Sequence, residues 1–579
     1  MRTVLRQLGR YKKDTLLCMA SATLEVIMEI LLPFITAIII DEGLEKANLS
    51  VVYRFGALMV VMAFFGLVFG ASAGKFAASA SAGFAANLRE AIYNNIQTFS
   101  FSNIDKFSVP GLVPRMTTAI TNVQNAFMTV IRIAIRAPLM FIFSFIMCLI
   151  ISPKLSLTFL IAVVFLVAVL GGIMVVTMKI FNQVFRKYDD LNASVQENIS
   201  AIRVVKAFVR EDYENKKFSK ASSTLYRMFV KAEGLLAFNN PAMMTAVYFC
   251  IIMISWLGSH YIVLGDMTSG DLTSLFSYVM SLLMSLMMLS MVVVMISMSM
   301  ASIRRISEVL NEVPDLHDPE NPVMEVADGS IDFDHVSFSY KHGSGKNVLT
   351  DIDLHIKAGE TIGVIGGTGA GKSSLVNLIC RLYDVDEGAV KVGGVDVRKY
   401  DMEALRNQVS VVLQKNTLFS GTILDNLRWG NPNATEEECI AACQAACADE
   451  FIDRFPDGYH TRIERGGANV SGGQKQRLCI ARALLKKPKI LILDDSTSAV
   501  DTATDAKIRA AFAQRIPGTT KIIIAQRISS VEGADRILVL DNGQINGFDT
   551  HERLLETNAI YREIYDSQVQ GGGDFDQPA

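Results

Sequence analysis

A short glycine-rich stretch in the second half of the chain has the residue types needed to hold phosphate groups. The stretch GGTGAGKSS spans residues 366–374 and follows the β-branched run Thr361–Ile365, which predicts a buried strand. Because glycines let backbone N–H groups curl round phosphate oxygens at the start of a helix, G-x-x-x-x-G-K-S predicts a nucleoside triphosphate site. The expected contact residues are Gly366, Gly367, Thr368, Gly369, Ala370, Gly371, Lys372, Ser373 and Ser374.

Two side chains of this loop can act directly on the nucleotide. The ammonium of Lys372 can reach the β- and γ-phosphates, and the hydroxyl of Ser373 can bind Mg²⁺. The alternative is an ordinary tight turn between a strand and a helix. It is disfavoured because the predicted strand and helix lie on the sides that nucleotide binding requires.

Other polar positions are expected to face the same nucleotide. The apolar run Ile490–Leu493 predicts a strand that ends in two carboxylates. The first, Asp494, would hold Mg²⁺, and the second, Asp495, would orient a water molecule. The amide of Gln414, which follows another predicted strand, could reach Mg²⁺ or the water. Tyr340 can stack on a base.

A second anion-binding feature is predicted at Ser471, Gly472, Gly473 and Gln474, which open a helix running to about Lys487. Serine at the cap with glutamine three residues later is a capping box, and an exposed helix N-terminus attracts anions.

The first half of the chain has the composition of a membrane protein. Hydrophobic residues make up 50% of the chain and the mean hydropathy is +0.32. The net charge of −3 gives no bulk argument for a nucleic-acid partner, and the eight scattered cysteines indicate reduced thiols. Apolar segments that satisfy the ~20-residue requirement for a bilayer helix lie near 16–40, 56–76, 128–151, 155–178, 242–264 and 274–297.

The distribution of Lys and Arg predicts the orientation of these spans. The N-terminal arm is basic, and so is the connection 179–231, whereas the opposite loops are short and poor in Lys and Arg. By the positive-inside rule, both termini are cytoplasmic. The apolar stretch after the arm is too long for a cleavable signal peptide.

The sequence predicts two domains. A helical transmembrane domain over 1–310 is followed by a proline-containing linker, 311–329, an α/β domain over 330–570 and a disordered tail over 571–579. The two long inner connections, 77–127 and 179–241, read as helical extensions into the cytoplasm. Their tips, Ser102–Phe107 and Glu211–Phe218, could dock another domain.

Polar and soft side chains in the spans suggest a substrate cavity. Glu25 and Glu29 lie one turn apart, and they could hold a cationic substrate or make hydrogen bonds between helices. Methionines recur at helical spacing in the sixth span, where they could contact apolar ligands or only pack. The methionines assigned to the cavity are Met284, Met288, Met291 and Met295. Arg132 and Arg136 are expected to mark the cytoplasmic end of the third span.

Three cysteines in the second half lie on one face of a predicted helix. Cys439, Cys443 and Cys447 repeat every fourth residue, but no nearby histidine completes a metal site, so we interpret them as packing residues.

The motifs of the second half, in order and spacing, resemble the cassette of an ABC transporter. They are Gly366–Ser373, Gln414, VSGGQKQR at 470–477, LILDD at 491–495 and STSAVD at 496–501. Six spans before one cassette resemble an exporter-type (type IV) half-transporter. The resemblance implies ATP and Mg²⁺ as cofactors, two halves in a lipid bilayer, and coupling at the two helical tips. It also implies that each ATP lies between one chain's phosphate loop and the other chain's SGGQ helix, with Ser498 and Asp501 in the D-loop.

Two positions depart from the family pattern. Asp495 stands where the family has a catalytic glutamate, and Gln526 stands where it has a switch histidine. Since general-base assistance is typically worth about 10²–10⁴-fold, the shorter carboxylate should slow hydrolysis. The chain therefore resembles the degenerate-site subunit of bacterial heterodimeric multidrug exporters. Its partner would be a non-identical half that carries the glutamate and the histidine.

The expected function is half of an ATP-driven exporter that moves lipophilic compounds or drugs out of the cytoplasm or inner leaflet by alternating access. The expected location is the bacterial plasma membrane, with the ATPase domain in the cytoplasm. The alternatives are an ATP-gated channel or regulatory subunit that does not pump, and an exporter-fold transporter of lipids, peptides or metal chelates.

Overall fold

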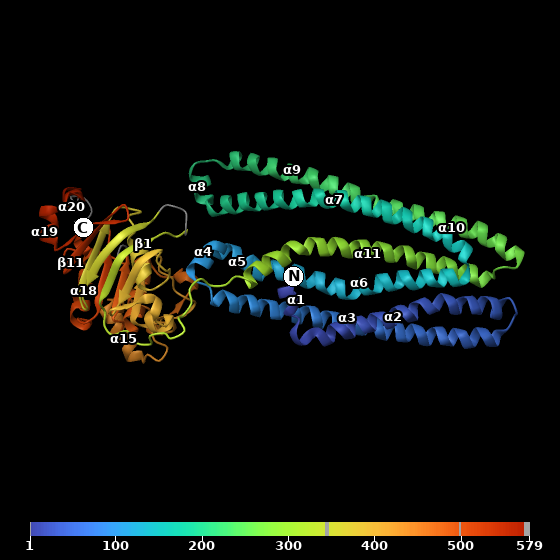
Figure 1. Ribbon diagram of the computed structural model, residues 1–579, viewed down its shortest axis with the longest axis horizontal. Coiled ribbons are helices and arrows are strands. Elements are labelled where there is room, and N and C mark those ends of the chain that lie inside the picture. The colour runs from blue at the N-terminus through green and yellow to red at the C-terminus, as the bar shows by residue number, and fades with distance from the viewer. Residues whose placement is uncertain (1, 342–346, 497–499, 572–579) are drawn as a thin grey trace. The chain divides into compact units, whose positions relative to one another are not determined.

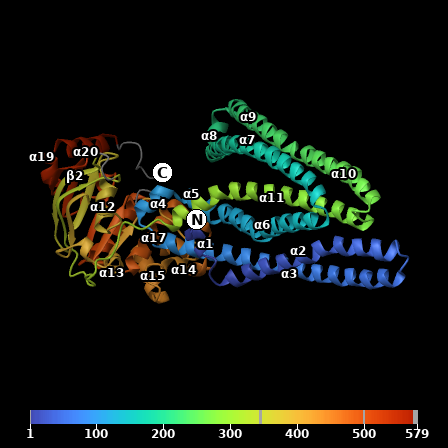
Figure 2. The same ribbon diagram turned by 45° about the vertical axis from the view of Figure 1, so that its right-hand side comes forward.

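The computed structural model describes residues 2–341, 347–496 and 500–571. Two compact units divide the chain. One contains Met1–Thr98 and Ser108–Glu312, and the other contains Phe99–Phe107 and Val313–Ala579. The first unit consists of long helices, and the second contains sheets with shorter helices (Figures 1 and 2).

The first unit is entirely helical in its regular elements. Its helices are α1 (Arg2–Arg6), η1 (Gly9–Tyr11), α2 (Lys12–Ile38), η2 (Ile39–Leu44), α3 (Leu49–Gln97), α5 (Val109–Met116), α6 (Thr118–Ile151), α7 (Pro153–Ser200), α8 (Ile202–Ala207), α9 (Glu211–Ala237), α10 (Asn239–Leu264) and α11 (Ser269–Leu310).

Within the described residues, six helical stretches are long and apolar enough to cross a membrane. They are Gly9–Leu44, Leu49–Gln97, Val109–Ile151, Pro153–Phe181, Glu211–Leu264 and Ser269–Leu310. Each contains one of the apolar segments predicted from the sequence. Helices α3 and α7 have 49 and 48 residues. At 1.5 Å per residue each is about 70 Å long, so it extends well beyond a hydrocarbon core of ~30 Å.

The first two spans show which helix faces are buried in the bundle and which are exposed. On α2, Cys18, Ala22, Val26 and Ile30 recur every fourth residue and are all buried, because this face packs in the bundle. In contrast, large apolar side chains of α3 such as Val60 are exposed. An apolar face of this extent is unfavourable in water and is suited to lipid or to another subunit.

The second unit is built on a mainly parallel sheet. This sheet has six strands in the order β12-β11-β3-β10-β9-β6. A second, antiparallel sheet has four strands in the order β2-β1-β4-β5. The strands are β1 (Ile331–Phe338), β2 (Leu349–Ile356), β3 (Thr361–Gly366), β4 (Glu387–Val392), β5 (Val395–Asp396), β6 (Val409–Val412), β7 (Gly421–Thr422), β8 (Arg462–Ile463), β9 (Ile490–Asp494), β10 (Thr520–Ile524), β11 (Arg536–Asp541) and β12 (Gln544–Asp549).

Helices and loops bury both faces of the six-stranded sheet. In β9, Ile490 and Ile492 join one hydrophobic core, and Leu491 and Leu493 join the other. This explains why the strand reads as a continuous apolar run. The helices of this unit are α4 (Phe101–Phe107), α12 (Lys372–Ile379), α13 (Met402–Gln408), α14 (Ile423–Leu427), α15 (Glu436–Ala445), α16 (Asp449–Ile452), α17 (Gly472–Leu485), α18 (Thr502–Arg515), α19 (His551–Thr557) and α20 (Ala559–Gly571). Apart from Gly571, the tail predicted at 571–579 lies outside the described residues.

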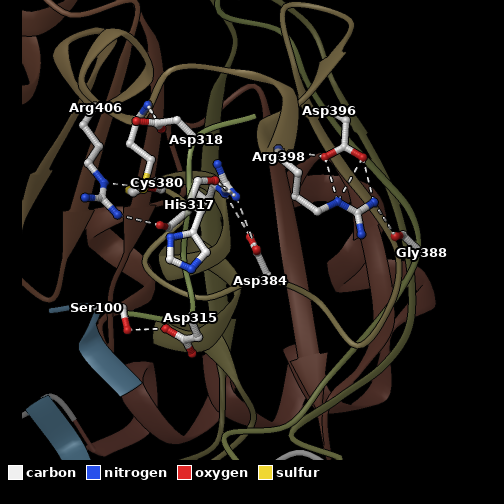
Figure 3. A network of polar contacts seen from close by, with 12 residues as sticks. Ser100, Asp315, His317, Asp318, Cys380, Asp384, Gly388, Asp396, Arg398 and Arg406 are labelled. Atoms are coloured by element: carbon white, nitrogen blue, oxygen red, sulfur yellow. Dashed lines mark hydrogen bonds and ion pairs between the residues drawn. The ribbon is translucent and has the colours of Figure 1, made fainter. Parts of the chain in front are cut away.

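A short segment from the first half of the sequence belongs to the second unit. The hydroxyls of Ser100 and Ser102 both donate to the carboxylate of Asp315, and Figure 3 shows Ser100 facing Asp315. The hydroxyl of Tyr383 donates to Asp105 Oδ2 at 2.7 Å. These contacts fix the segment that contains α4, the first of the two predicted docking tips, to Asp315 of the linker and to Tyr383 beyond it.

Near Asp315, arginine side chains bond to backbone carbonyls and to a carboxylate, which holds the neighbouring segments together (Figure 3). Buried Arg381 donates to His317 O at 3.0 Å and pairs with Asp384. Arg406 donates to Cys380 O and Arg381 O at 3.3 and 2.7 Å.

The second predicted docking tip is displaced by about two turns of helix. The chain reverses at α8 and residues 208–210, and Glu211–Phe218 forms the first turns of α9. Val204 and Phe208 of this reversal are exposed apolar side chains. The sequence interpretation missed them because it followed the charged and aromatic residues of α9.

Candidate functional site

The predicted phosphate loop connects β3 to α12, and the backbone requires glycine at its first and last glycine positions. Gly371 has φ +96°, and a Cβ there would lie 3.1 Å from Val348 O. A Cβ on Gly366 would lie only 2.2 Å from Leu540 O. A side chain at either position would therefore collide with backbone atoms. Because glycine has no side chain, the N–H groups of the loop stay accessible to a ligand.

Lys372 is held against this loop. Its Nζ donates to Gly366 O at 2.7 Å and to Gly367 O at 2.9 Å. Burial lowers the pKa of Lys372, and the charges of Asp494 and Asp495 oppose that shift. A phosphate in the loop would add negative charge beside a desolvated ammonium, which favours the charged form of the lysine.

Ser373 and Asp494 together offer oxygen ligands for a divalent cation. The Ser373 hydroxyl donates to Asp494 Oδ1 at 3.2 Å. Carboxylate and hydroxyl oxygens at this spacing fit Mg²⁺, which binds to proteins through one or two oxygens and keeps the phosphates and water as its other ligands. Burial raises the pKa of Asp494 and Asp495 adds to the shift, while Ser373 and Lys372 oppose it.

Asp494→Asn is expected to raise the melting temperature of the nucleotide-free protein at neutral pH. The raised pKa means that the folded state binds the proton more tightly than the unfolded state, so ionised Asp494 reduces stability above that pKa. The gain should be full above the raised pKa and vanish below the ordinary value of 3.8. Thermal unfolding without Mg²⁺ across this pH range measures it. With Mg²⁺·ATP the variant should instead melt below the wild type, because it lacks a ligand for Mg²⁺.

Asp495 lies in a cluster with the two glutamines that were predicted to face the nucleotide. Gln526 Nε2 donates to Asp495 Oδ2 at 2.9 Å, and Gln414 Nε2 approaches the same oxygen at 3.3 Å. The three residues follow β9, β10 and β6, which are adjacent parallel strands with their carboxyl ends at one edge of the sheet. The carboxylate is therefore shared by two amides beside the phosphate loop.

Backbone contacts support this cluster. Asp495 has φ +48° and its N–H donates to Ile524 O at 3.0 Å. From α20, the Gln568 side chain donates to Gln526 O at 2.8 Å and accepts from Ile528 N–H at 2.9 Å. The contribution of Gln568 could not be found from sequence, because it lies 42 residues from Gln526.

Tyr340 is near the phosphate-loop helix and is 46% exposed as a residue. Its hydroxyl lies 2.9 Å from Ser374 Oγ, and its ring meets Tyr383 edge to face at 5.1 Å. Tyr383 was missed in the sequence interpretation, although it also bonds Asp105 of α4. Burial raises the pKa of Tyr383, and its bond to Asp105 adds to the shift. Tyr340, the predicted base-stacking residue, is thus linked to the segment that contains α4 through the ring of Tyr383.

The SGGQ stretch forms the predicted capping box. Gln474 N–H donates to Ser471 Oγ at 3.3 Å, and Ser471 N–H donates to Gln474 Oε1 at 2.9 Å. In the described part of the chain, the side-chain hydrogen bonds of Ser471 are confined to this box and do not reach the residues around the phosphate loop. Asp501 caps α18 through Thr504 N–H at 2.9 Å, and Ser498 lies outside the described residues.

The two glutamates of the first span form ion pairs with the third span. Arg136 Nη1 lies 2.6 Å from Glu25 Oε1, and Nη2 lies 2.7 Å from Glu29 Oε2. Arg136 lies in α6, and its two partners are more than 100 residues away in sequence. That Arg132 and Arg136 mark the cytoplasmic end of the third span stays a prediction. The interhelical alternative for Glu25 and Glu29 is present.

A cavity of about 170 Å³ adjoins this triad. Glu29 and Arg136 line one part of it, and methionines of α6 and α11 line another. Met284 and Met288 are among its lining residues, together with Met140 and Met280. Of the other predicted cavity residues, Glu25, Met291 and Met295 are not part of the lining.

Arg136→Leu is expected to destabilise the membrane domain. The change leaves two carboxylates close together without their cation. Breaking a fully buried ion pair from one side costs about 3–5 kcal/mol, and the cost here should be smaller because the three side chains are only partly buried. Thermal unfolding of the detergent-purified protein measures the loss. The triple variant Glu25→Gln/Glu29→Gln/Arg136→Leu should recover most of it. Equal stability of the single variant and the wild type would contradict a structural role for the triad.

The three cysteines of α15 and the turn after it pack in a hydrophobic core. Cys439, Cys443 and Cys447 are all buried there. Burial raises the pKa of each thiol, which favours the inert neutral form.

Comparison with known proteins identifies both halves of the chain. Residues 15–306 match the ABC transporter transmembrane region, and residues 349–498 match the ABC transporter family. The chain is similar to YfiB of Bacillus subtilis, an uncharacterized ABC transporter ATP-binding protein, with 36% identity over 94% of each chain. It is 34% identical to the ATP-dependent lipid A-core flippase of Desulfotalea psychrophila, over 79% of this chain and 80% of the flippase.

The fold agrees with this assignment. A bacterial Atm1-family ABC exporter solved with ATP bound superposes with a TM-score of 0.83, covering 99% of this chain and 100% of the exporter at 24% identity. The transmembrane region and the cassette therefore follow each other as the sequence predicted. The chain belongs to the ABC transporter family, as a multi-pass membrane half-transporter with one cytoplasmic ATP-binding cassette.

Proposed function

We propose that this chain is one half of a heterodimeric exporter and that its own phosphate loop holds ATP at a slowly hydrolysing site. The observation that carries the proposal is the cluster at Asp495. Its carboxylate is one methylene shorter than the family's glutamate, and the amides of Gln526 and Gln414 share one of its oxygens. An amide in place of the switch histidine also cannot supply an imidazolium charge.

The remaining parts of the site are those that bind nucleotide. The loop N–H groups and Lys372 would hold the phosphates, Ser373 and Asp494 would hold Mg²⁺, and Tyr340 would stack on the base. Mg²⁺ would draw negative charge from the phosphate oxygens. ATP should therefore bind here and close the two cassettes, while turnover takes place mainly at the other composite site. That site would use this chain's Ser471–Gln474 helix.

The substrate is proposed to be lipophilic. Methionine side chains adapt to apolar ligands of different shapes, and four of them line the cavity beside Arg136. The similarity to a lipid A-core flippase supports a lipid-like molecule as one substrate class. ATP closure of the cassettes would move the substrate from the inner leaflet or cytoplasm outward.

Purification of the tagged chain from its native membrane tests the pairing. The expected result is a one-to-one complex with a different half-transporter that has glutamate and histidine at the two substituted positions. A homodimer that hydrolyses ATP rapidly would contradict the proposal.

Reconstitution of this complex tests the direction and the mechanism. Vesicles with outward-facing cassettes should accumulate a lipophilic dye against its gradient when Mg²⁺·ATP is added. Movement that only dissipates a gradient would instead indicate an ATP-gated channel, and release of preloaded substrate toward the cassettes would indicate an importer.

A further inference from the structure

A cavity of about 280 Å³ lies in the cassette, apart from the nucleotide site. Its wall includes the start of β3, the start of β10 and one side of α18. The lining residues used below are Thr361, Arg509, Lys521 and Ser530. Lys521 pairs with Thr361, the first residue of β3, whereas the phosphate loop begins at the other end of that strand. At ~3.3 Å per residue, the strand separates the two places by roughly 16 Å.

Lys521 is a buried cation without a carboxylate partner. The residue is only 5% exposed, and its Nζ donates to Thr519 O at 2.9 Å. Among the residues that the structure describes, no carboxylate lies within 4.0 Å of this ammonium. Buried charges in proteins are normally paired, because an unpaired one has lost its hydration. The ammonium thus has unused donors and no carboxylate in contact with it, in the wall of a cavity.

The charged groups nearby have other partners. The Asp535 carboxylate accepts from Thr361 N–H at 2.8 Å. Its charge raises the pKa of Lys521, but burial, the larger effect, lowers that pKa. Asp505 Oδ2 lies 3.3 Å from Arg509 Nε and accepts from Ser530 Oγ at 3.2 Å. Asp505 therefore pairs with Arg509, whereas the charge of Asp535 acts on Lys521 only from beyond 4.0 Å.

We propose that this cavity binds a small multivalent oxyanion, with Lys521 as its charge partner. Charge-assisted N–H···O bonds are the strong class of hydrogen bond, and the cavity presents an ammonium and a guanidinium to one space. At ~30 Å³ per water molecule, the volume accommodates a small ion with part of its hydration shell. Phosphate and dicarboxylates share the required chemistry and are the two sources to distinguish.

The test is calorimetric titration of the detergent-purified transporter complex with phosphate and, separately, with malonate. Saturating Mg²⁺·ADP is present throughout, so that the phosphate loop is filled. The wild type should bind at least one of the two anions, and the one that binds identifies the source. Lys521→Met should weaken this binding at least about tenfold. Lys486→Met is the matched control. Burial lowers the pKa of Lys486 as it does that of Lys521, but Lys486 lies outside the cavity and donates to Arg406 O.

A stability measurement separates loss of the site from misfolding. Without added anion, Lys521→Met should melt at or above the wild-type temperature, because it removes a buried charge that has no carboxylate in contact with it. Added phosphate or malonate should then raise the melting temperature of the wild type and of Lys486→Met, but not of Lys521→Met. The proposal is overturned if neither anion binds in the presence of Mg²⁺·ADP, or if Lys521→Met binds as the wild type does.

Discussion

Gly473→Asp in this chain is expected to abolish ATP hydrolysis by the purified complex, whereas Asp495→Asn should leave most of it intact. The new carboxylate would occupy the N-terminus of α17, where the partner's ATP is proposed to bind, and it would repel the γ-phosphate. Loss of one preorganised group that stabilises an anion typically costs about 10²–10³-fold in rate. Asp495→Asn should change the rate by less than about twofold, since this site is proposed to contribute little to catalysis.

Steady-state ATPase assays on the reconstituted complex measure both effects. Gly518→Asp is a suitable control for the first, because a side chain at Gly518 meets open space in a surface turn. The control for the second is neutralisation of the catalytic glutamate in the partner, which should remove nearly all turnover. If Asp495→Asn stops hydrolysis while the change in the partner is harmless, the two sites have been assigned the wrong way round.

The double variant Asp495→Glu/Gln526→His is expected to accelerate hydrolysis at this chain's own site by up to about 10²-fold. The added methylene extends the carboxylate toward the nucleotide, and an imidazole replaces the amide that bonds Asp495 at 2.9 Å. The imidazole can carry a positive charge beside the γ-phosphate.

Single-turnover hydrolysis isolates this site when the catalytic glutamate of the partner is neutralised. Asp495→Gln/Gln526→His has the same side-chain length without the carboxylate, and it should remain as slow as the starting complex. An unchanged rate in the Glu/His variant, with normal ATP binding, would show that the slow turnover has another cause.

The nucleotide-binding part of the site could be predicted because local sequence determines it. Gly366–Ser373 must be a strand, a tight loop and a helix start in that order, and Ser471 with Gln474 defines a capping box within four residues. The apolar runs of the spans are similarly local. Six of them are present in the described chain, where they were expected.

Contacts between distant residues were the part that sequence could not supply. The ion pairs of Arg136 could not be predicted, because its two glutamates lie on another helix. Tyr383 and Gln568 belong to no sequence motif. Their roles depend on which segments of the chain meet in the folded protein. The buried Lys521 was equally hidden, since a lysine at the start of a strand is normally exposed.

The contacts of residues 99–107 have a consequence for work on the cassette alone. A protein expressed from residue 313 onward would lack the segment that bonds Asp315 and Tyr383. Asp315 would lose the hydroxyls of Ser100 and Ser102, and the ring that touches Tyr340 would lose its acceptor. Nucleotide affinities measured on such a fragment would describe a cassette in which Tyr383, the neighbour of Tyr340, has lost its contact with Asp105. Adding a synthetic peptide of residues 97–109 in trans would show how much of the affinity this contact contributes.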